Sequence, residues 1–442
     1  MPMPHFATAR PRRAKLLAAL LLVLGGSGAQ ADTLLDLYHA AQPYDATYLA
    51  ARAQAEADQY RAEQANALRL PSVGLGLSGT RTRIDPSSTP TNPSGRQLDS
   101  TVYNAALRGQ QPLFNRANAA TIAQAQRSLE ISSANLQLAE QELLVRVSQA
   151  YFDVLAAQDT LATARSGKTA IEQQLASAKR NFEVGTPTIT DTREAQARFD
   201  LSRAQEIAAD NDLRTRRVVL DQLVGRSNVQ PDPLAQPMVL PPVLPADAES
   251  WVMLGADEHP QIRRARTALE IARLETEKAR AGHLPTVDLV GSLGSQHQSG
   301  SAVFGQPRDA TSAAIGVQMN LPLFAGFAVQ NRIKETLALE DKAANDLDAV
   351  RRGVATATRQ VFFSLQSGQA QVRALEAAEA SSKLALEATQ LGYKVGVRVS
   401  LDVLNAQAQL YQTQRDLAAA RYNVLLGTLR LRQAAGRLLP ED

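Results

Sequence analysis

Apolar residues that recur every seven positions dominate two long stretches of the chain. The members of the two series are Ile122, Leu129, Leu136 and Leu143 in the first stretch, and Leu347, Val354 and Val361 in the second. Ala and Gln fill much of the sequence between them, and the 69 residues from Arg116 to Val184 contain almost no Gly or Pro. At 1.5 Å per residue, this stretch predicts a helix of about 100 Å that packs against neighbouring helices as in a coiled coil.

Alternation of apolar with small or polar residues marks four shorter stretches. Val73, Leu75 and Leu77 alternate with Ser and Gly directly after Pro71. The other three alternating stretches lie at about 103–110, 287–293 and 313–321. A period of two predicts β-strands, two ahead of each long helix. Polar segments at 85–95 and 296–308 are expected to be the loops between the strands of each pair.

The same order of elements occurs twice, so the chain is an internal duplication. Asp45–Leu70 aligns with His259–Leu284 without a gap, and a proline follows each segment. The second strand of each pair ends in Pro-Leu-Phe, at 112–114 and 322–324. A Val-Gly pair ends each long helix, and a shorter helix then follows, at about 191–224 and 402–435.

These patterns divide the chain into four parts. The first repeat spans 32–228 and the second spans 247–442. The linker at 229–246 holds six prolines between Gln230 and Pro245, and therefore cannot form a helix. Residues 1–31 combine four basic residues, an apolar core at 16–24 and Ala29-Gln30-Ala31, which is the pattern of a cleaved export signal.

Charge and composition narrow the function classes. The formal net charge is +3, and removal of the four basic residues of the signal leaves −1, so we expect no nucleic-acid partner. The chain has no cysteine, which excludes disulfides and thiolate zinc sites. The four histidines that follow the predicted signal, His39, His259, His283 and His297, show no metal-ligand spacing. We therefore expect no enzyme activity, no cofactor and no metal site.

The number of strands limits what one copy of the chain can build. Two strands per repeat give four per chain, whereas an antiparallel membrane barrel needs at least eight. An open sheet edge in lipid leaves backbone groups without hydrogen bonds, so several copies must contribute strands together. An export signal, a shared barrel and long polar helices together indicate a conduit that crosses one membrane and an aqueous space.

The duplication, the paired Leu-Pro strands, the two Pro-Leu-Phe segments and "GYKVGVRVSLDVLNAQ" give the chain a clear resemblance. It resembles the TolC-like outer-membrane channels of Gram-negative bacteria. The resemblance implies a mainly α protein with a membrane β-barrel: a homotrimer with a 12-stranded barrel and a 12-helix periplasmic tunnel. It also implies an exit duct for type I secretion or tripartite efflux, with a periplasmic adaptor and an inner-membrane pump as partners.

The turns that end the long helices carry the candidate site. Asp191 and Asp402 stand where the next helices begin, and as N-caps they would stabilise those helices. In the family this tip is where the tunnel narrows and neighbouring turns are linked. The resemblance therefore implies a periplasmic gate, in which Tyr393 and Arg398 donate hydrogen bonds to Thr190 and Asp191.

The family also places acidic rings at the narrowest point of the tunnel. Asp402 matches the outer ring, but Asn405 stands one helical turn on, where the second acid would be. Because hard cations prefer anionic oxygens, we expect only weak cation binding at this pore constriction.

The Val-Gly pairs match the tip positions that adaptors contact in the family. These are Val184 and Gly185 on the first turn, and Val395 and Gly396 on the second. Glycine is also the usual residue after a helix end, so the same pairs are expected to act as C-caps. The two roles are compatible.

Two other classes share part of the pattern. A periplasmic adaptor or a structural coiled-coil protein would also have an export signal and heptads, but an adaptor has one helical hairpin rather than two alternating with strand pairs. A simple porin does not contain a 69-residue helix. The sequence leaves open whether the cargo is a protein or a small molecule.

Overall fold

The structure is a computed structural model of the chain and describes residues 32–84, 97–183, 189–234, 238–300 and 308–441. The predicted export signal at 1–31 lies outside the described residues. So do the predicted loop at 85–95 and the Val184-Gly185 pair.

Each repeat places a strand pair between two helices, as the duplication predicts. The strands are β1 (Ser72–Ile84), β2 (Leu98–Phe114), β3 (Thr286–Ser299) and β4 (Arg308–Asn320). The helices before them are α2 (Ala46–Asn66) and α6 (Pro260–Arg280), each followed by one 3₁₀ turn, η1 (Ala67–Arg69) or η2 (Ala281–His283). The long helices are α3 (Arg116–Glu183) and α7 (Ala328–Lys394), followed by α4 (Ile189–Val224) and α8 (Ser400–Ala434).

Two features differ from the expectation. The short helices α1 (Leu34–Ala41) and α5 (Ala248–Gly255) stand ahead of α2 and α6, and both are too short for a periodicity argument. The loop predicted at 296–308 is shorter than expected, because β3 continues to Ser299. Residues 296–299 stay in the strand since they pair with β2, for instance Gln296 with Asn104.

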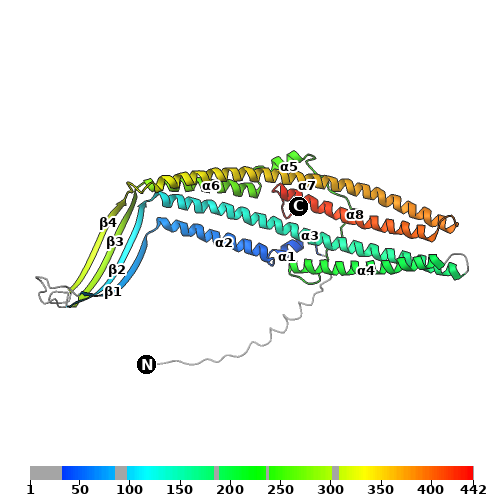
Figure 1. Ribbon diagram of the computed structural model, residues 1–442, viewed down its shortest axis with the longest axis horizontal. Helices are drawn as coiled ribbons and strands as arrows, with labels where there is room; N and C mark the ends of the chain where they lie inside the picture. Colours follow the sequence, from blue (N-terminus) through cyan, green and yellow to red (C-terminus); the bar gives the residue numbers. More distant parts are fainter. Residues whose placement is uncertain (1–31, 85–96, 184–188, 235–237, 301–307, 442) are drawn as a thin grey trace, which may run out of the picture.

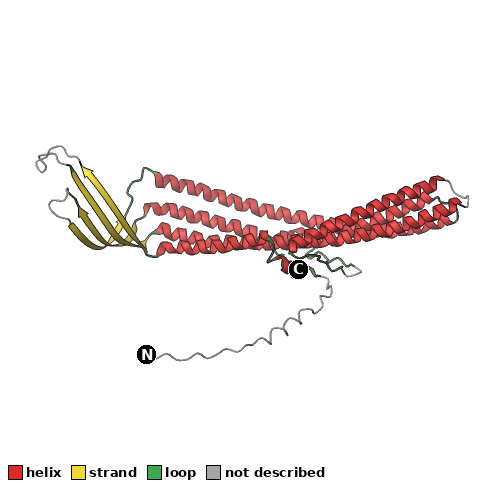
Figure 2. Cartoon of the chain, turned by 90° about the horizontal axis from the view of Figure 1, so that it is seen from below, coloured by secondary structure: helices red, strands yellow, loops and turns green. Residues whose placement is uncertain are grey.

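The four strands form one antiparallel sheet in the order β1-β2-β3-β4, at one end of the molecule (Figures 1 and 2). The central pair, β2 and β3, joins the two repeats into a single sheet. In the described part of the chain β1 and β4 are the two edge strands, and each has one strand partner. One copy of the chain therefore presents two open edges.

The register puts most of the apolar residues of the sheet on one face. Leu75 stands opposite Leu107, which pairs in turn with Leu293. Leu75 is 67% exposed and Ile315, on the same face of β4, is 80% exposed. Apolar residues so open to solvent in a single chain indicate a face that contacts lipid or another protein.

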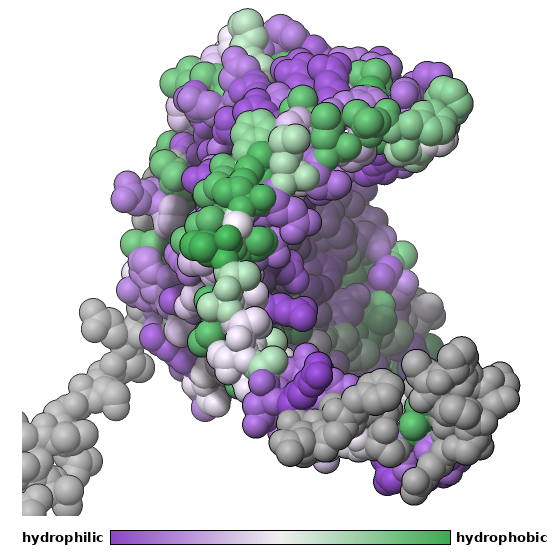
Figure 3. All heavy atoms as spheres, turned by 90° about the vertical axis from the view of Figure 1, so that its left-hand side faces the viewer, coloured by the Kyte–Doolittle hydropathy of each residue, from purple (hydrophilic) through white to green (hydrophobic). Residues whose placement is uncertain are grey.

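The helices form one curved layer that extends from the sheet (Figure 1). Near the sheet α3 packs between α2 and α6, and farther away it packs between α4 and α8. The other long helix, α7, packs against α6 near the sheet and against α8 farther away. Seen end-on from the sheet, this layer is a wall around a hollow that is open on one side (Figure 3). Within the described residues, no helix is both long enough and apolar enough to span a membrane.

The largest core lies at mid-length, where α1, α3, α4 and α8 meet. Leu37, Leu143, Val154 and Leu220 are completely buried there. Several residues of the heptad series, such as Ile122 and Leu347, are also buried between helices, which confirms the coiled-coil interpretation.

Two junctions interrupt the layer at mid-length, one in each repeat. At the first junction the C-terminal end of α4 meets the N-terminal end of α2, and a Cβ on Gly225 would lie only 2.4 Å from the ring of Tyr44. At the second junction the end of α8 meets the start of α6, and a Cβ on Gly436 would lie 2.8 Å from the Cα of His259. Both glycines have a positive φ, of +72° and +70°. Glycine is thus required at both positions.

Asp45 caps α2 at the first junction. Its carboxylate accepts hydrogen bonds from the backbone N–H of Tyr48 at 2.7 Å and from the guanidinium of Arg146 at 2.9 and 3.0 Å. Burial alone would raise the pKa of Asp45, but these hydrogen bonds outweigh burial, and the pKa lies below its ordinary value.

His259 caps α6 at the second junction. Its Nδ1 accepts a hydrogen bond from the backbone N–H of Gln261 at 3.1 Å, so this nitrogen carries no proton. Burial lowers the pKa of His259, and a hydrogen bond with the backbone of Gln433 offsets only part of this effect. The ring is therefore neutral at pH 7.

Candidate functional site

The turn between α7 and α8 lies at the end of the molecule that is remote from the sheet (Figure 1). Gly396 has φ +83°, its N–H bonds to the carbonyl of Tyr393 at 3.1 Å, and the N–H of Val397 bonds to that of Gly392 at 2.9 Å. These two bonds close a Schellman motif. The C-cap interpretation of Gly396 is thus confirmed, with Val395 as the last residue before it.

Arg398 is placed by this turn. A Cβ on Gly392 would lie 2.8 Å from its Cγ, so the side chain of Arg398 runs directly over Gly392. Its Nη1 lies 3.6 Å from Oδ2 of Asp402, four residues later. Because both side chains are at least a third exposed, this pair adds little to stability and leaves the guanidinium accessible to other acceptors.

The expectation that Asp191 and Asp402 are N-caps is wrong by three residues, since the N-cap of α8 is Val399. α4 begins at Ile189 and α8 at Ser400, so both carboxylates are at the third helical position. Oδ2 of Asp402 instead accepts the backbone N–H of Val399 at 3.5 Å, a long hydrogen bond. A carboxylate in the first turn still interacts favourably with the helix dipole.

Tyr393 links the two helical hairpins. Its hydroxyl oxygen accepts a hydrogen bond from Nδ2 of Asn181 on α3 at 3.3 Å, while its ring packs near Val403 and Leu410. Asn181 lies ten residues before Asp191, on the other side of the first turn. Sequence reasoning missed Asn181, because a long helix offers no local signal for an asparagine that faces another hairpin.

Asn405, predicted at the pore constriction, is also part of a link between hairpins. Its Oδ1 accepts a hydrogen bond from Nη2 of Arg198 on α4 at 3.0 Å. A third link joins Nε2 of Gln174 on α3 to Oγ of Ser400 at 2.9 Å. The oxygen of Asn405 is therefore already bonded to a guanidinium of the protein itself.

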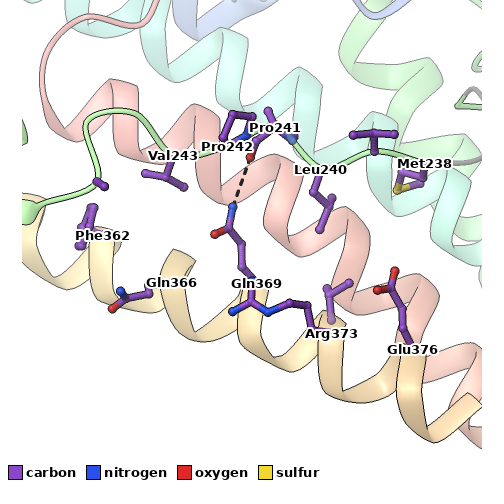
Figure 4. Close-up of a pocket in the computed structure, with 13 residues that line it drawn as sticks. Met238, Leu240, Pro241, Pro242, Val243, Phe362, Gln366, Gln369, Arg373 and Glu376 are labelled. Atoms are coloured by element: carbon purple, nitrogen blue, oxygen red, sulfur yellow. Dashed lines mark hydrogen bonds between the residues drawn. The ribbon is translucent and has the colours of Figure 1, made fainter.

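The linker forms an exposed groove against α7, away from the tip. Residues 238–243 run in extended form alongside the helix, and Nε2 of Gln369 donates to the carbonyl of Pro241 at 3.3 Å (Figure 4). The groove has a volume of about 600 Å³. In its described residues the linker contains no helix, which confirms the expectation for a proline-rich segment.

An open four-stranded sheet, continued by a duplicated layer of helices with 68- and 67-residue members, defines a class of protein. It is the architecture of an outer-membrane channel with a long helical tunnel. The chain matches the model of the "Outer membrane efflux protein" family twice, at residues 37–226 and 254–437.

Proteins of this class are similar to the chain in sequence and in fold. The alkaline protease secretion protein AprF of Pseudomonas aeruginosa is 34% identical over 97% of this chain and 89% of its own length. The outer membrane protein TolC of Vibrio cholerae is 29% identical over 94% of this chain and 93% of its own. The solved structure of VceC, also from Vibrio cholerae, has the same fold, with a TM-score of 0.76, 22% identity and coverage of 91% of this chain and 96% of that one.

The chain belongs to the outer membrane efflux protein family. It is an outer-membrane exit duct, as the resemblance in its sequence implies. Its fold is the tunnel-plus-barrel fold of that family.

Proposed function

We propose that three copies of the chain form one duct, which conducts cargo passively from an inner-membrane pump, through a periplasmic adaptor, to the exterior. The open edges of the four-stranded sheet carry this proposal. Four strands are too few for a barrel, and three copies give twelve. The hollow wall in Figure 3 is likewise open on one side, as a third of a tunnel would be. The duct itself performs no catalysis.

The mass of the detergent-solubilised particle tests the assembly. We expect three chains per particle by native mass spectrometry, with no concentration dependence in the micromolar range. A stable monomer or dimer in a detergent that preserves the sheet would contradict the proposal.

We propose that the cargo is a secreted protein. Two relatives support it by name: the alkaline protease secretion protein AprF at 34% identity, and the proteases secretion protein PrtF of Dickeya chrysanthemi at 30%. A deletion strain should then lose specific proteins from its culture medium and keep its resistance to dyes and detergents. The opposite result, drug sensitivity with an unchanged set of secreted proteins, would assign the duct to efflux of small molecules.

The gate proposed for Thr190, Asp191, Tyr393 and Arg398 is supported by their location at the tip and by the link from Tyr393 to the other hairpin. The double change Tyr393→Phe with Arg398→Ser removes both donors. We expect a several-fold higher conductance in planar bilayers, since each charged hydrogen bond is worth about 1.5–3 kcal/mol. Arg214→Ser on the exposed surface of α4 is the control. Conductance equal to the wild type in the double variant would show that these residues do not hold the tip closed.

The adaptor is proposed to dock on the second turn. Val395, Val397 and Val399 are 65%, 76% and 57% exposed, so three of the five residues between α7 and α8 are exposed apolar side chains. Val397→Asp should weaken pull-down of the adaptor and leave the assembly of the duct intact. Unchanged capture of the adaptor would place its contact elsewhere.

A further inference from the structure

The apolar face of the sheet becomes charged toward the end that is remote from the helices (Figure 1). Successive side chains of a strand point to opposite faces, so Val73, Leu75 and Leu77 share one face of β1 with Arg81 and Arg83. The two arginine side chains are 68% and 57% exposed. In an outer-membrane barrel the molecules that cover such an apolar face are lipids. Both arginines are therefore on the side of the sheet that faces lipid.

Strand length places the two arginines just beyond an apolar band of membrane thickness. On β3 the same face runs from Val287 to His297, which stands opposite Tyr103. These ten residues, at about 3.4 Å each and tilted by about 40° as in membrane barrels, cover a height of about 26 Å. The apolar band of such barrels is about 25 Å tall and is flanked by aromatic residues such as Tyr103. Thr101, which pairs with Arg81, is two residues farther on and thus level with the lipid headgroups.

The two guanidinium groups converge on a single anionic group. Nε of Arg83 lies 3.1 Å from Oδ1 of Asp99 on β2, and Nη2 of Arg81 lies 3.6 Å from Oδ2 of the same carboxylate. Both cations therefore reach the two oxygens of one small anion at the same time. Because two cations share one carboxylate, the group of three side chains keeps a net positive charge.

The other charged pair of this face is too distant to neutralise the arginines. His297 on β3 and Asp309 on β4 bond to each other. Within one chain β4 is three strands away from β1, which is about 14 Å at about 4.8 Å per strand. Among the described residues of this face, Asp99 is thus the one carboxylate within reach of Arg81 and Arg83.

We propose that Arg81 and Arg83 bind the phosphate of a phosphorylated lipid, whose acyl chains cover the neighbouring apolar residues of the sheet. Paired N–H donors of a guanidinium match the oxygens of a phosphate. An exposed ion pair contributes little to stability, and it would need one arginine rather than two. The site rests on the outer-membrane location and on residues of one chain, and not on the proposed cargo or number of copies.

Native mass spectrometry of the solubilised full-length protein, with lipid A added as the phosphorylated lipid, tests the site. We expect the wild type to retain lipid A, and the double variant Arg81→Gln with Arg83→Gln to bind it at least about tenfold more weakly. The matched control is Arg308→Gln. Arg308 is an exposed arginine that pairs with Gln298, at nearly the same height but on the opposite face of the sheet. The same spectra count the chains per particle, so a failure of the proposed assembly is read separately.

Asp99→Asn distinguishes a lipid site from an ion pair that only stabilises the sheet. Loss of the carboxylate frees both guanidinium groups, so lipid A should bind several-fold more tightly although the ion pair is lost. Inorganic phosphate at millimolar concentration should not displace the lipid, since the lipid also buries apolar surface against the strands.

Four results would each overturn the proposal. The double variant could retain lipid A as well as the wild type does, or Arg308→Gln could lose as much of it as the double variant. Asp99→Asn could fail to bind the lipid more tightly. Free phosphate could displace the lipid, which would make the arginines a general anion site.

Discussion

The two junctions at mid-length occupy equivalent positions in the two repeats, yet different chemistry holds them together. At the first junction a charged Asp45 caps the helix and is paired with Arg146. At the second junction a neutral His259 caps the helix, and its ring nitrogen accepts the backbone hydrogen bond. Both repeats have a side chain that accepts a hydrogen bond at the start of the helix, and both have a glycine, Gly225 or Gly436, packed against that start. The two repeats differ in the capping side chain.

The largest effect is expected from Arg146→Met at the first junction. Asp45 is 7% exposed, so loss of its partner would leave a nearly buried carboxylate unpaired, at a cost of about 3 kcal/mol. Amide hydrogen exchange should show faster local opening at the first turn of α2. The first turn of α6, which has no such pair, serves as the internal control. Equal protection at α2 in the variant and the wild type would contradict this account of the junction.

The next largest effect is a loss of thermal stability when the glycine of either junction is replaced by alanine. Gly436→Ala would place a Cβ 2.8 Å from the backbone of His259, and its φ of +70° adds about 1–2 kcal/mol of strain. Gly225→Ala should be similarly harmful because the Tyr44 ring is 2.4 Å away. Gly353→Ala is the matched control, since nothing lies within 4 Å of its added Cβ and helix propensity favours Ala. Thermal melting should fall in the first two variants only.

The smallest effect separates the two junctions by pH. His259 has a folded-state pKa below the unfolded value of about 6.5, so its contribution is present above pH 6.5 and is lost as pH falls below it. The pKa of Asp45 is also lowered, but its contribution is lost only below about pH 4.

Between pH 6.5 and 4.5, therefore, only the start of α6 should lose protection in hydrogen exchange. His259→Asn keeps an N-cap without a titrating group and should remove this dependence. If α2 and α6 lose protection together, the cap chemistry does not control the junctions.

Periodicity predicted the strands and the long helices, and proline content predicted the linker, because each is set by local residue patterns. The link between Asn405 and Arg198 could not be predicted, since it joins residues 207 positions apart whose contact depends on how two hairpins pack. His259 was interpreted only as one of several scattered histidines, because histidine is rarely an N-cap. The third-position placement of Asp191 and Asp402 was missed because helix starts are the least distinct part of a pattern.

The pairing of β2 with β3 also constrains the order in which the chain acquires its structure. Ala105 pairs with Ser295, 190 positions later in the chain. An isolated hairpin of β1 and β2 is only marginally stable in water. The sheet therefore cannot become stable until β3 and β4, in the first half of the second repeat, have been made and exported. Closure of so long a loop is slow, and the exposed apolar face of the first hairpin needs protection from aggregation during that delay.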